Sequence, residues 1–171
     1  MRKVAVIDSS SLISFDHLVL AEKLCLYFSA VFVPRAVQRE VNRKARFRYR
    51  LNRLYRQGFF QRCKAADKTS VNLLLIDLDE GESEALIQAQ EKQATEQAVL
   101  YFIGDERRAR EIGENMGLKP VGTVRLSALL HRDELAPEPK ALVRRLRHDL
   151  GFRMSEKVVE EAIAMASEPI D

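Results

Sequence analysis

Two acidic residues each follow an apolar run at the point where the run ends. Asp8 comes directly after Val4–Ile7, and Asp105 comes one glycine after Leu100–Ile103. Both runs are typical of buried strands. In open parallel sheets the carboxyl ends of the strands meet at one edge, and ligands bind there. We therefore expect Asp8 and Asp105 to lie near each other despite their separation in sequence.

Three glutamates add carboxylates at the same edge of the predicted sheet. Glu40 lies in the helical pattern after the second predicted strand, at the edge of its buried stripe. Glu82 and Glu84 open the helical pattern that follows the apolar run Leu73–Leu78. Carboxylates gathered at one site raise each other's pKa unless a cation lies between them. Oxygen ligands without His or Cys favour Mg²⁺ or Mn²⁺, which activate water for phosphodiester hydrolysis.

Each acid also has a purely structural explanation. Asp8 and Asp105 are suitable helix N-caps, because their carboxylates accept hydrogen bonds from free backbone N–H groups. Asp79 and Glu82 fit a capping box, which leaves Glu84 as the stronger ligand candidate of the two glutamates. Glu40 is alternatively a solvated helix residue. Spacing alone leaves the catalytic and the structural interpretations open.

The elements that must position these acids alternate along the chain. Extended patterns lie at Val4–Ile7, Val31–Val33, Val99–Ile103 and Pro120–Val121. Helical patterns separate them, which predicts an α/β fold with a mostly parallel sheet covered on both faces. We place this α/β domain at residues 1–136. Residues 137–171 predict a C-terminal extension of two helices, which Gly151 separates.

The bulk composition is that of a globular chain. The 171 residues suit one domain with a sizeable core, and 46% are hydrophobic and 31% charged. No apolar run approaches the roughly 20 residues that cross a bilayer, and no signal-peptide pattern precedes the first strand. The two cysteines, Cys25 and Cys63, form no CxxC pair. We expect no membrane association, no zinc site and a location in the reducing cytoplasm.

The net charge of +3 conceals a strongly cationic segment. Residues 35–68 contain twelve Lys or Arg and two acids, and residues 43–64 contain nine Lys or Arg and no acid. Aromatic residues alternate with these cations, and the combination suits the phosphates and unpaired bases of RNA. We predict a basic helical arm over about residues 43–64. The cations that we expect to bind RNA are Arg43, Lys44, Arg46, Arg48, Arg50, Arg53 and Arg56.

Two other interpretations of the basic segment stay open. Part of its apolar content recurs at helical spacing, at Leu51, Leu54 and Tyr55, and predicts core packing rather than base stacking. The arginines are also suited to a solvated face or to docking an acidic protein partner. A nucleic acid or an acidic partner explains a long run without acids better than an inert surface does.

Five stretches of the sequence, taken in order, resemble the PIN-domain nucleases, and in particular the VapC-type toxins of bacteria and archaea. The first four are IDSSSLI, VPRAVQREV, GESEALIQA and FIGDERRAREIGENMGLKPVGTV. The fifth, LRHDLGFRMSEKVVEEAIAMASE, resembles the C-terminal extension of one PIN subfamily, in which Gly-Phe precedes a final helix. Together they cover nearly the whole chain.

This resemblance implies a three-layer α/β/α sandwich and a metal-dependent endoribonuclease that is the toxin of a toxin–antitoxin pair. The acids at the positions of the family's catalytic and metal-binding motifs are Asp8, Glu40, Glu84 and Asp105. Ser10 matches the hydroxyl beside the first acid, and Glu82 is a rival to Glu84. The implied cofactor is Mg²⁺ or Mn²⁺, and the implied partners are RNA, an antitoxin and a second copy of the chain. The alternative is a PIN fold that holds RNA or a protein through the basic arm without cutting.

Overall fold

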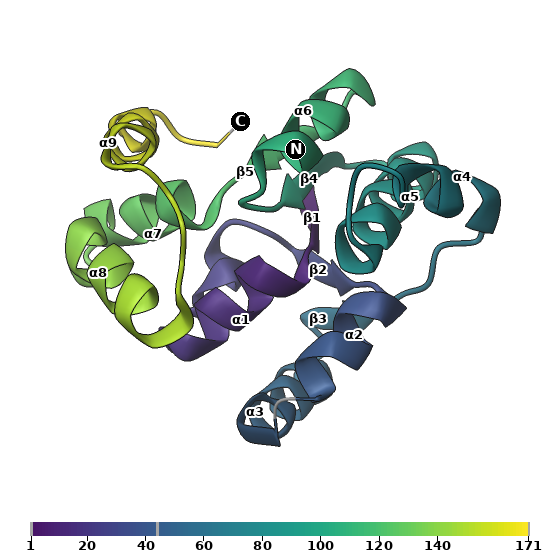
Figure 1. Cartoon of the computed structure of the whole chain (residues 1–171). Coiled ribbons are helices and arrows are strands. Elements are labelled where there is room, and N and C mark those ends of the chain that lie inside the picture. Colours follow the sequence, from purple (N-terminus) through teal and green to yellow (C-terminus); the bar gives the residue numbers. More distant parts are fainter. Residues whose placement is uncertain (1, 44, 171) are drawn as a thin grey trace.

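A five-stranded, all-parallel sheet forms the centre of the protein, with strand order β3-β2-β1-β4-β5 (Figure 1). The computed structural model describes residues 2–43 and 45–170, and it describes the side chains of α3 from residue 50 onward. The strands are β1 Lys3–Ile7, β2 Ala30–Val33, β3 Phe60–Arg62, β4 Val99–Ile103 and β5 Lys119–Val121. The predicted α/β fold with a parallel sheet is confirmed.

Helices cover both faces of this sheet and complete the three predicted layers (Figure 1). The α-helices are α1 Ser9–His17, α2 Arg35–Asn42, α3 Ala45–Arg56, α4 Lys68–Leu74, α5 Glu80–Thr95, α6 Arg107–Asn115, α7 Thr123–Arg132, α8 Pro139–Leu150 and α9 Glu156–Ala164. Two 3₁₀ helices, η1 Ala21–Leu26 and η2 Met165–Ser167, follow α1 and α9. No helix in the described part of the chain is long and apolar enough to cross a membrane.

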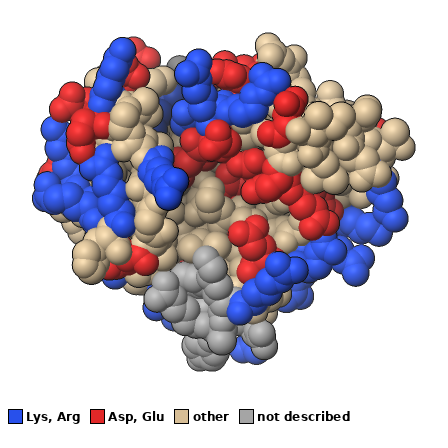
Figure 2. All heavy atoms as spheres, viewed as in Figure 1, with Lys and Arg blue, Asp and Glu red and all other residues tan. Residues whose placement is uncertain are grey.

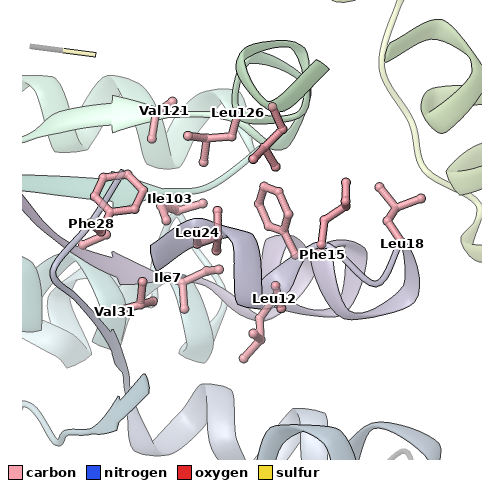
Figure 3. Packing of buried hydrophobic residues seen from close by; sticks show 14 of the residues in the cluster. Ile7, Leu12, Phe15, Leu18, Leu24, Phe28, Val31, Ile103, Val121 and Leu126 are labelled. Atoms are coloured by element: carbon pink, nitrogen blue, oxygen red, sulfur yellow. The ribbon is translucent and has the colours of Figure 1, made fainter. Parts of the chain in front are cut away.

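Successive residues of β1 face opposite layers. Ile7 packs with Leu12 and Phe15 of α1 and with Leu126 of α7 (Figure 3). Val6 belongs to the core of the other face, which α5 and α6 cover. Because both faces are buried, the central strands are continuous apolar runs and not alternating ones. That is why the sequence indicates them clearly.

The central strand β1 lies at the point where the chain changes direction across the sheet. From β1 the chain adds β2 and β3 on one side, and it then crosses over to add β4 and β5 on the other. Ile7 is in register with Ile103, and the Asp8 backbone N–H donates to the Ile103 carbonyl at 3.0 Å. The ends of β1 and β4 therefore form the crevice where ligands bind in such sheets.

The basic segment contains a strand that the sequence analysis did not predict. In β3, Phe60 is buried whereas Gln61 and Arg62 are exposed, and three residues are too few to give an apolar run. The strand pairs with β2 at the edge of the sheet. Leu51 and Leu54 of α3 are buried in the same core as α1, so part of the segment is structural.

The C-terminal helices join the main core. Leu142 and Leu146 of α8 belong to the same cluster as α1 and α7, and Val159 of α9 packs against Val124 of α7. The end of the chain returns to the sheet, where the Lys3 amino group donates to the Ile170 carbonyl (Figure 1). Gly151 separates these two helices as predicted: it ends α8 at φ 68°, and the Ser155 hydroxyl caps α9.

We predict that Leu146→Ala lowers the free energy of unfolding by about 2–5 kcal/mol, because Leu146 is 1% exposed and truncation leaves a cavity in the main core. Urea denaturation followed by circular dichroism measures the change. Ile76→Ala, at a side chain that is 81% exposed, is the control and should cost little. A cost near that of the control would contradict a shared core for α8 and the sheet.

Candidate active site

Asp8 stands between the end of β1 and the start of α1. Its Oδ1 accepts a hydrogen bond of 2.7 Å from the Ser11 backbone N–H, so Asp8 is the N-cap of α1. The Ser10 hydroxyl also donates to this oxygen, at 3.2 Å. The capping interpretation of Asp8 is therefore correct, and Ser10 touches this carboxylate as predicted. Capping uses only one of the two carboxylate oxygens.

The second oxygen of Asp8 is buried and makes no hydrogen bond with any described residue. Asp8 as a whole is 1% exposed. Gly104 leaves room for this oxygen, because a Cβ at that position would lie 2.9 Å from Asp8 Oδ2 and 2.5 Å from the Phe102 ring. Burying a carboxylate oxygen without a hydrogen-bond partner is energetically costly. A cation bound at this oxygen would compensate for that cost.

Asp105 lies beside Asp8 and is held by a different helix from the one expected. The N-cap residue of α6 is Glu106, whereas Asp105 bonds to the first residue of α7. Its two oxygens accept from the Thr123 backbone N–H at 2.8 Å and from the Thr123 hydroxyl at 2.5 Å. The Ser11 hydroxyl also lies 3.5 Å from Asp105 Oδ2. Ser11 thus contacts both aspartates and joins them into one cluster.

Glu40 and Glu82 approach the aspartates from α2 and α5. The close approach of α5 needs a glycine, because a Cβ at Gly81 would lie 2.8 Å from the Ser9 hydroxyl and 3.6 Å from Glu40 Oε2. Glu82 also completes the predicted capping box, which is confirmed: Asp79 Oδ1 accepts from the Glu82 backbone N–H at 2.8 Å. While it takes part in this capping box, Glu82 also lines the acidic site.

These acids surround a cleft of about 410 Å³. Its acidic lining residues are Glu40, Glu82, Asp105 and Glu106. Figure 2 shows acidic residues gathered across the middle of this face, with basic residues around them. The opposite wall is the linker between α8 and α9, and its Arg153 is the one Lys or Arg among the described residues that line the cleft. The sequence analysis missed both Glu106 and Arg153.

Glu84 does not line this cleft. It is buried on another face of α5, where its carboxylate accepts from the Ala36 backbone N–H in the first turn of α2 and from the Ala65 backbone N–H at 3.4 Å. The structure therefore brings Asp8, Glu40 and Asp105 together as predicted, and adds Glu82 in place of Glu84. Side chains two positions apart on a helix point to different sides, so Glu82 and Glu84 do not share one site.

The grouping of like charges changes their proton affinity. Burial, followed by repulsion from Asp105, raises the pKa of Asp8 to about 7. Burial and the neighbouring carboxylates of Asp79, Glu106 and Glu40 raise the pKa of Glu82 to about 7 as well. Burial also raises the pKa of Asp105, although hydrogen bonds from Thr123 oppose the change. A bound cation would oppose all three shifts.

The donor set fits Mg²⁺ or Mn²⁺ held by few protein ligands. Among the described residues no group of three or more His, Cys, Asp or Glu lies close enough together to form a complete cage. Mg²⁺ needs no such cage, because it keeps several waters and takes one or two carboxylates together with substrate phosphates. Asp8 Oδ2 supplies a free oxygen of this kind, and the described lining of the cleft includes no His or Cys.

The predicted RNA-binding arginines of the basic arm have different surroundings. Arg50 donates to the Asp16 carbonyl at 2.8 Å, and Arg53 forms an ion pair of 2.6 Å with Glu22. These two side chains hold α3 against the end of α1 and η1. Arg43 and Arg56 are exposed. Lys44 and the side chains of Arg46 and Arg48 lie outside the described residues.

The comparison with family models gives a match over most of the chain. A family model described as a PIN domain matches residues 4–168 of the chain. The matched range includes β1 from its second residue, all of β2 to β5, and all of the acids described above. The comparison with curated proteins found no match.

We predict that Asp8→Asn raises the free energy of unfolding of the metal-free protein at pH 8 by about 1–3 kcal/mol. The pKa of Asp8 is about 7 in the folded protein against an ordinary 3.8, so the protonated form favours folding. The wild type therefore loses stability as pH rises from about 4 through about 7, whereas the amide keeps the cap and carries no charge.

Urea denaturation in EDTA from pH 4 to pH 8 measures this difference, and adding Mg²⁺ at pH 8 should stabilise the wild type only. A variant that is less stable than the wild type at pH 8 without metal would contradict the account, because the fold itself would then favour the ionised carboxylate.

Proposed function

The chain belongs to the PIN-domain family, and from that premise we propose that it is a metal-dependent endoribonuclease that hydrolyses RNA at the acidic cleft. The observation that carries the proposal is the convergence of Asp8, Asp105, Glu40 and Glu82 at the carboxyl ends of β1 and β4. Nuclease activity of a general kind follows from the family. The metal dependence and the RNA substrate are the proposal.

The proposed chemistry assigns each acid a task. A bound Mg²⁺ or Mn²⁺ supplies an activated water and stabilises the charge on the phosphate. Asp8 is the proposed central ligand, because its Oδ2 is the acceptor that no described group satisfies. Asp105, fixed by Thr123, is the second. Glu40 and Glu82 face them from α2 and α5, where they would orient water around the ion without contacting it directly.

We assign the third acidic position to Glu82 and not to Glu84. Glu82 lines the cleft and its pKa responds to Glu40 and Glu106. Both oxygens of Glu84 accept from backbone N–H groups of α2 and of the segment after β3. A carboxylate with both oxygens engaged in this way is placed to support the fold rather than to hold an ion.

Cations beside the cleft support a polyanionic substrate. Arg153 lines the cleft opposite the acids and forms no ion pair with a described residue, so it is placed to contact a substrate phosphate. Arg43, three residues after Glu40 in the sequence, and Arg56 of the basic arm add exposed positive charge outside the cleft lining. Phosphate contacts of this kind provide affinity without reading the base sequence.

The toxin role is proposed from the resemblance alone, together with an antitoxin and a homodimer as partners. One surface feature supports a protein partner. The last turn of α4 and the residues after it expose apolar side chains, with Leu73 63% and Ile76 81% accessible. Neighbouring exposed apolar side chains are typical of surfaces that another chain covers.

We predict that Glu82→Gln lowers the rate of metal-dependent RNA cleavage about 10–100-fold, which is the usual cost of removing a partner that acts on a metal site from the outer sphere. Glu84→Gln is the matched control: it removes the same charge two residues away and keeps the side-chain length. Cleavage of mixed single-stranded and structured RNAs by the full chain, with Mg²⁺, Mn²⁺ or EDTA, gives both rates.

A larger loss in Glu84→Gln than in Glu82→Gln, with both variants folded, would overturn the assignment of the third acid. No cleavage by the wild type under any metal condition, with salt-sensitive RNA binding retained, would favour the alternative of a non-cleaving binding module.

A further inference from the structure

A second pocket lies beside the acidic cleft, on the other side of the contact between α2 and α5. Its volume is about 360 Å³. The cations that line it are Arg35, Arg39, Lys64 and Lys68. None of these four belongs to the set of arm residues from which we expected RNA contacts. The pocket is therefore a cationic feature that the proposed function has not yet used.

Most of the positive charge in this pocket is not neutralised by the protein. Arg39 forms an ion pair with Glu80. The other acid in the lining, Glu84, directs its oxygens to two backbone N–H groups. Arg35, Lys64 and Lys68 form no ion pair with a described residue. The lining contains four cations and two acids, and this excess of positive charge favours an anionic ligand.

Hydrogen bonds to two glutamates of α5 hold the backbone that carries the pocket's cations. Glu84 accepts from the backbone N–H groups of Ala36 and Ala65, which directly follow Arg35 and Lys64. Two turns further along α5, Glu91 accepts from the backbone N–H groups of Ala66 and Asp67, each at 2.8 Å. These bonds fix the segment between β3 and α4 against α5. The backbone that carries the cations is thus held in place before any ligand binds.

The pocket adjoins the proposed site of cleavage. Arg39 lines the pocket and Glu40, the next residue of α2, lines the acidic cleft. In the same way, Glu80 of α5 lines the basic pocket and Glu82 lines the acidic cleft. Gly81 lies between them, where a Cβ would be 3.6 Å from Glu40 Oε2. An RNA chain that extended from the acidic cleft over this contact between α2 and α5 would reach the basic pocket next.

We propose that Arg35, Lys64 and Lys68 form a subsite for a backbone phosphate of the RNA, a few nucleotides from the bond that is cut. The inference rests on the proposed function. RNA suits both sites better than an acidic protein does. The phosphates of RNA carry bound cations with them into the acidic cleft. The carboxylates of an acidic protein would be repelled by the carboxylates of the cleft.

The test uses the full chain carrying Asp8→Asn, so that RNA stays intact, and measures its affinity for a single-stranded RNA as a function of salt. The pocket variant is Lys64→Ala with Lys68→Ala. The matched control is Lys140→Ala with Lys157→Ala, which removes the same charge from α8 and α9. The pocket variant should bind about 5–10-fold more weakly, with a salt slope smaller by about 0.7–1.4, as expected for one or two lost phosphate contacts.

A second measurement locates the phosphate. RNAs in which single linkages are replaced by uncharged methylphosphonate should include one position, near the cut, that weakens binding of the parent protein but not of the pocket variant. Equal affinity and equal salt slope in the pocket and control variants, with matching thermal melts, would overturn the subsite. If the wild type fails to cut RNA while the pocket variant still loses affinity, the subsite stands and the nuclease proposal fails.

Discussion

The parallel pairing of β1 with β4 is the constraint on which the rest of the site depends. It sets Ile7 in register with Ile103, and the backbone bond from Asp8 to Ile103 continues this ladder past the end of the strands. Because of this pairing, carboxylates separated by nearly a hundred positions come into one cluster. A shift of one residue in either strand would turn Asp8 or Asp105 away from the crevice.

Helix N-termini make it tolerable to place two aspartates side by side in a buried position. Asp8 accepts from the first turn of α1, and Asp105 accepts from the first turn of α7. The partial positive charge of each helix end favours a carboxylate there. These contacts do not remove the repulsion, because burial and Asp105 still raise the pKa of Asp8 to about 7. The fold thus provides a preformed cluster of carboxylates whose repulsion the proposed divalent cation would relieve.

Much of this arrangement could be predicted from the sequence, and the failures have physical reasons. Buried parallel strands are continuous apolar runs, so β1, β2 and β4 were found, and strand-end logic placed Asp8 and Asp105 together. The sequence could not choose between Glu82 and Glu84. Helical periodicity shows that they point to different sides, but only the packing of α5 decides which side faces the cleft. The motif GESEAL favoured Glu84, whereas the close approach at Gly81 gives the cleft to Glu82.

Long-range contacts were the other features beyond the reach of local patterns. Arg153 reaches the cleft only because α8 and α9 fold back along α7 and α1. Arg50 and Arg53 belong to an acid-free run, yet their partners Asp16 and Glu22 lie far upstream in the sequence. The run of charge showed that the segment is cationic, but not which cations the protein uses for its own packing. The cations without an ion pair among the described residues include Arg43 and Arg56 on the surface. They also include Arg35, Lys64 and Lys68 in the pocket beside Glu84.

The most direct test of the central claim is a crystal structure with Mn²⁺, with the ion located by its anomalous scattering. The account predicts a peak in contact with Asp8 Oδ2, on the side of the cleft that Asp105 and Glu82 share, and its loss in crystals of Asp8→Asn. A well-ordered structure with no peak at Asp8, or with an ion held at Glu84 instead, would contradict the account.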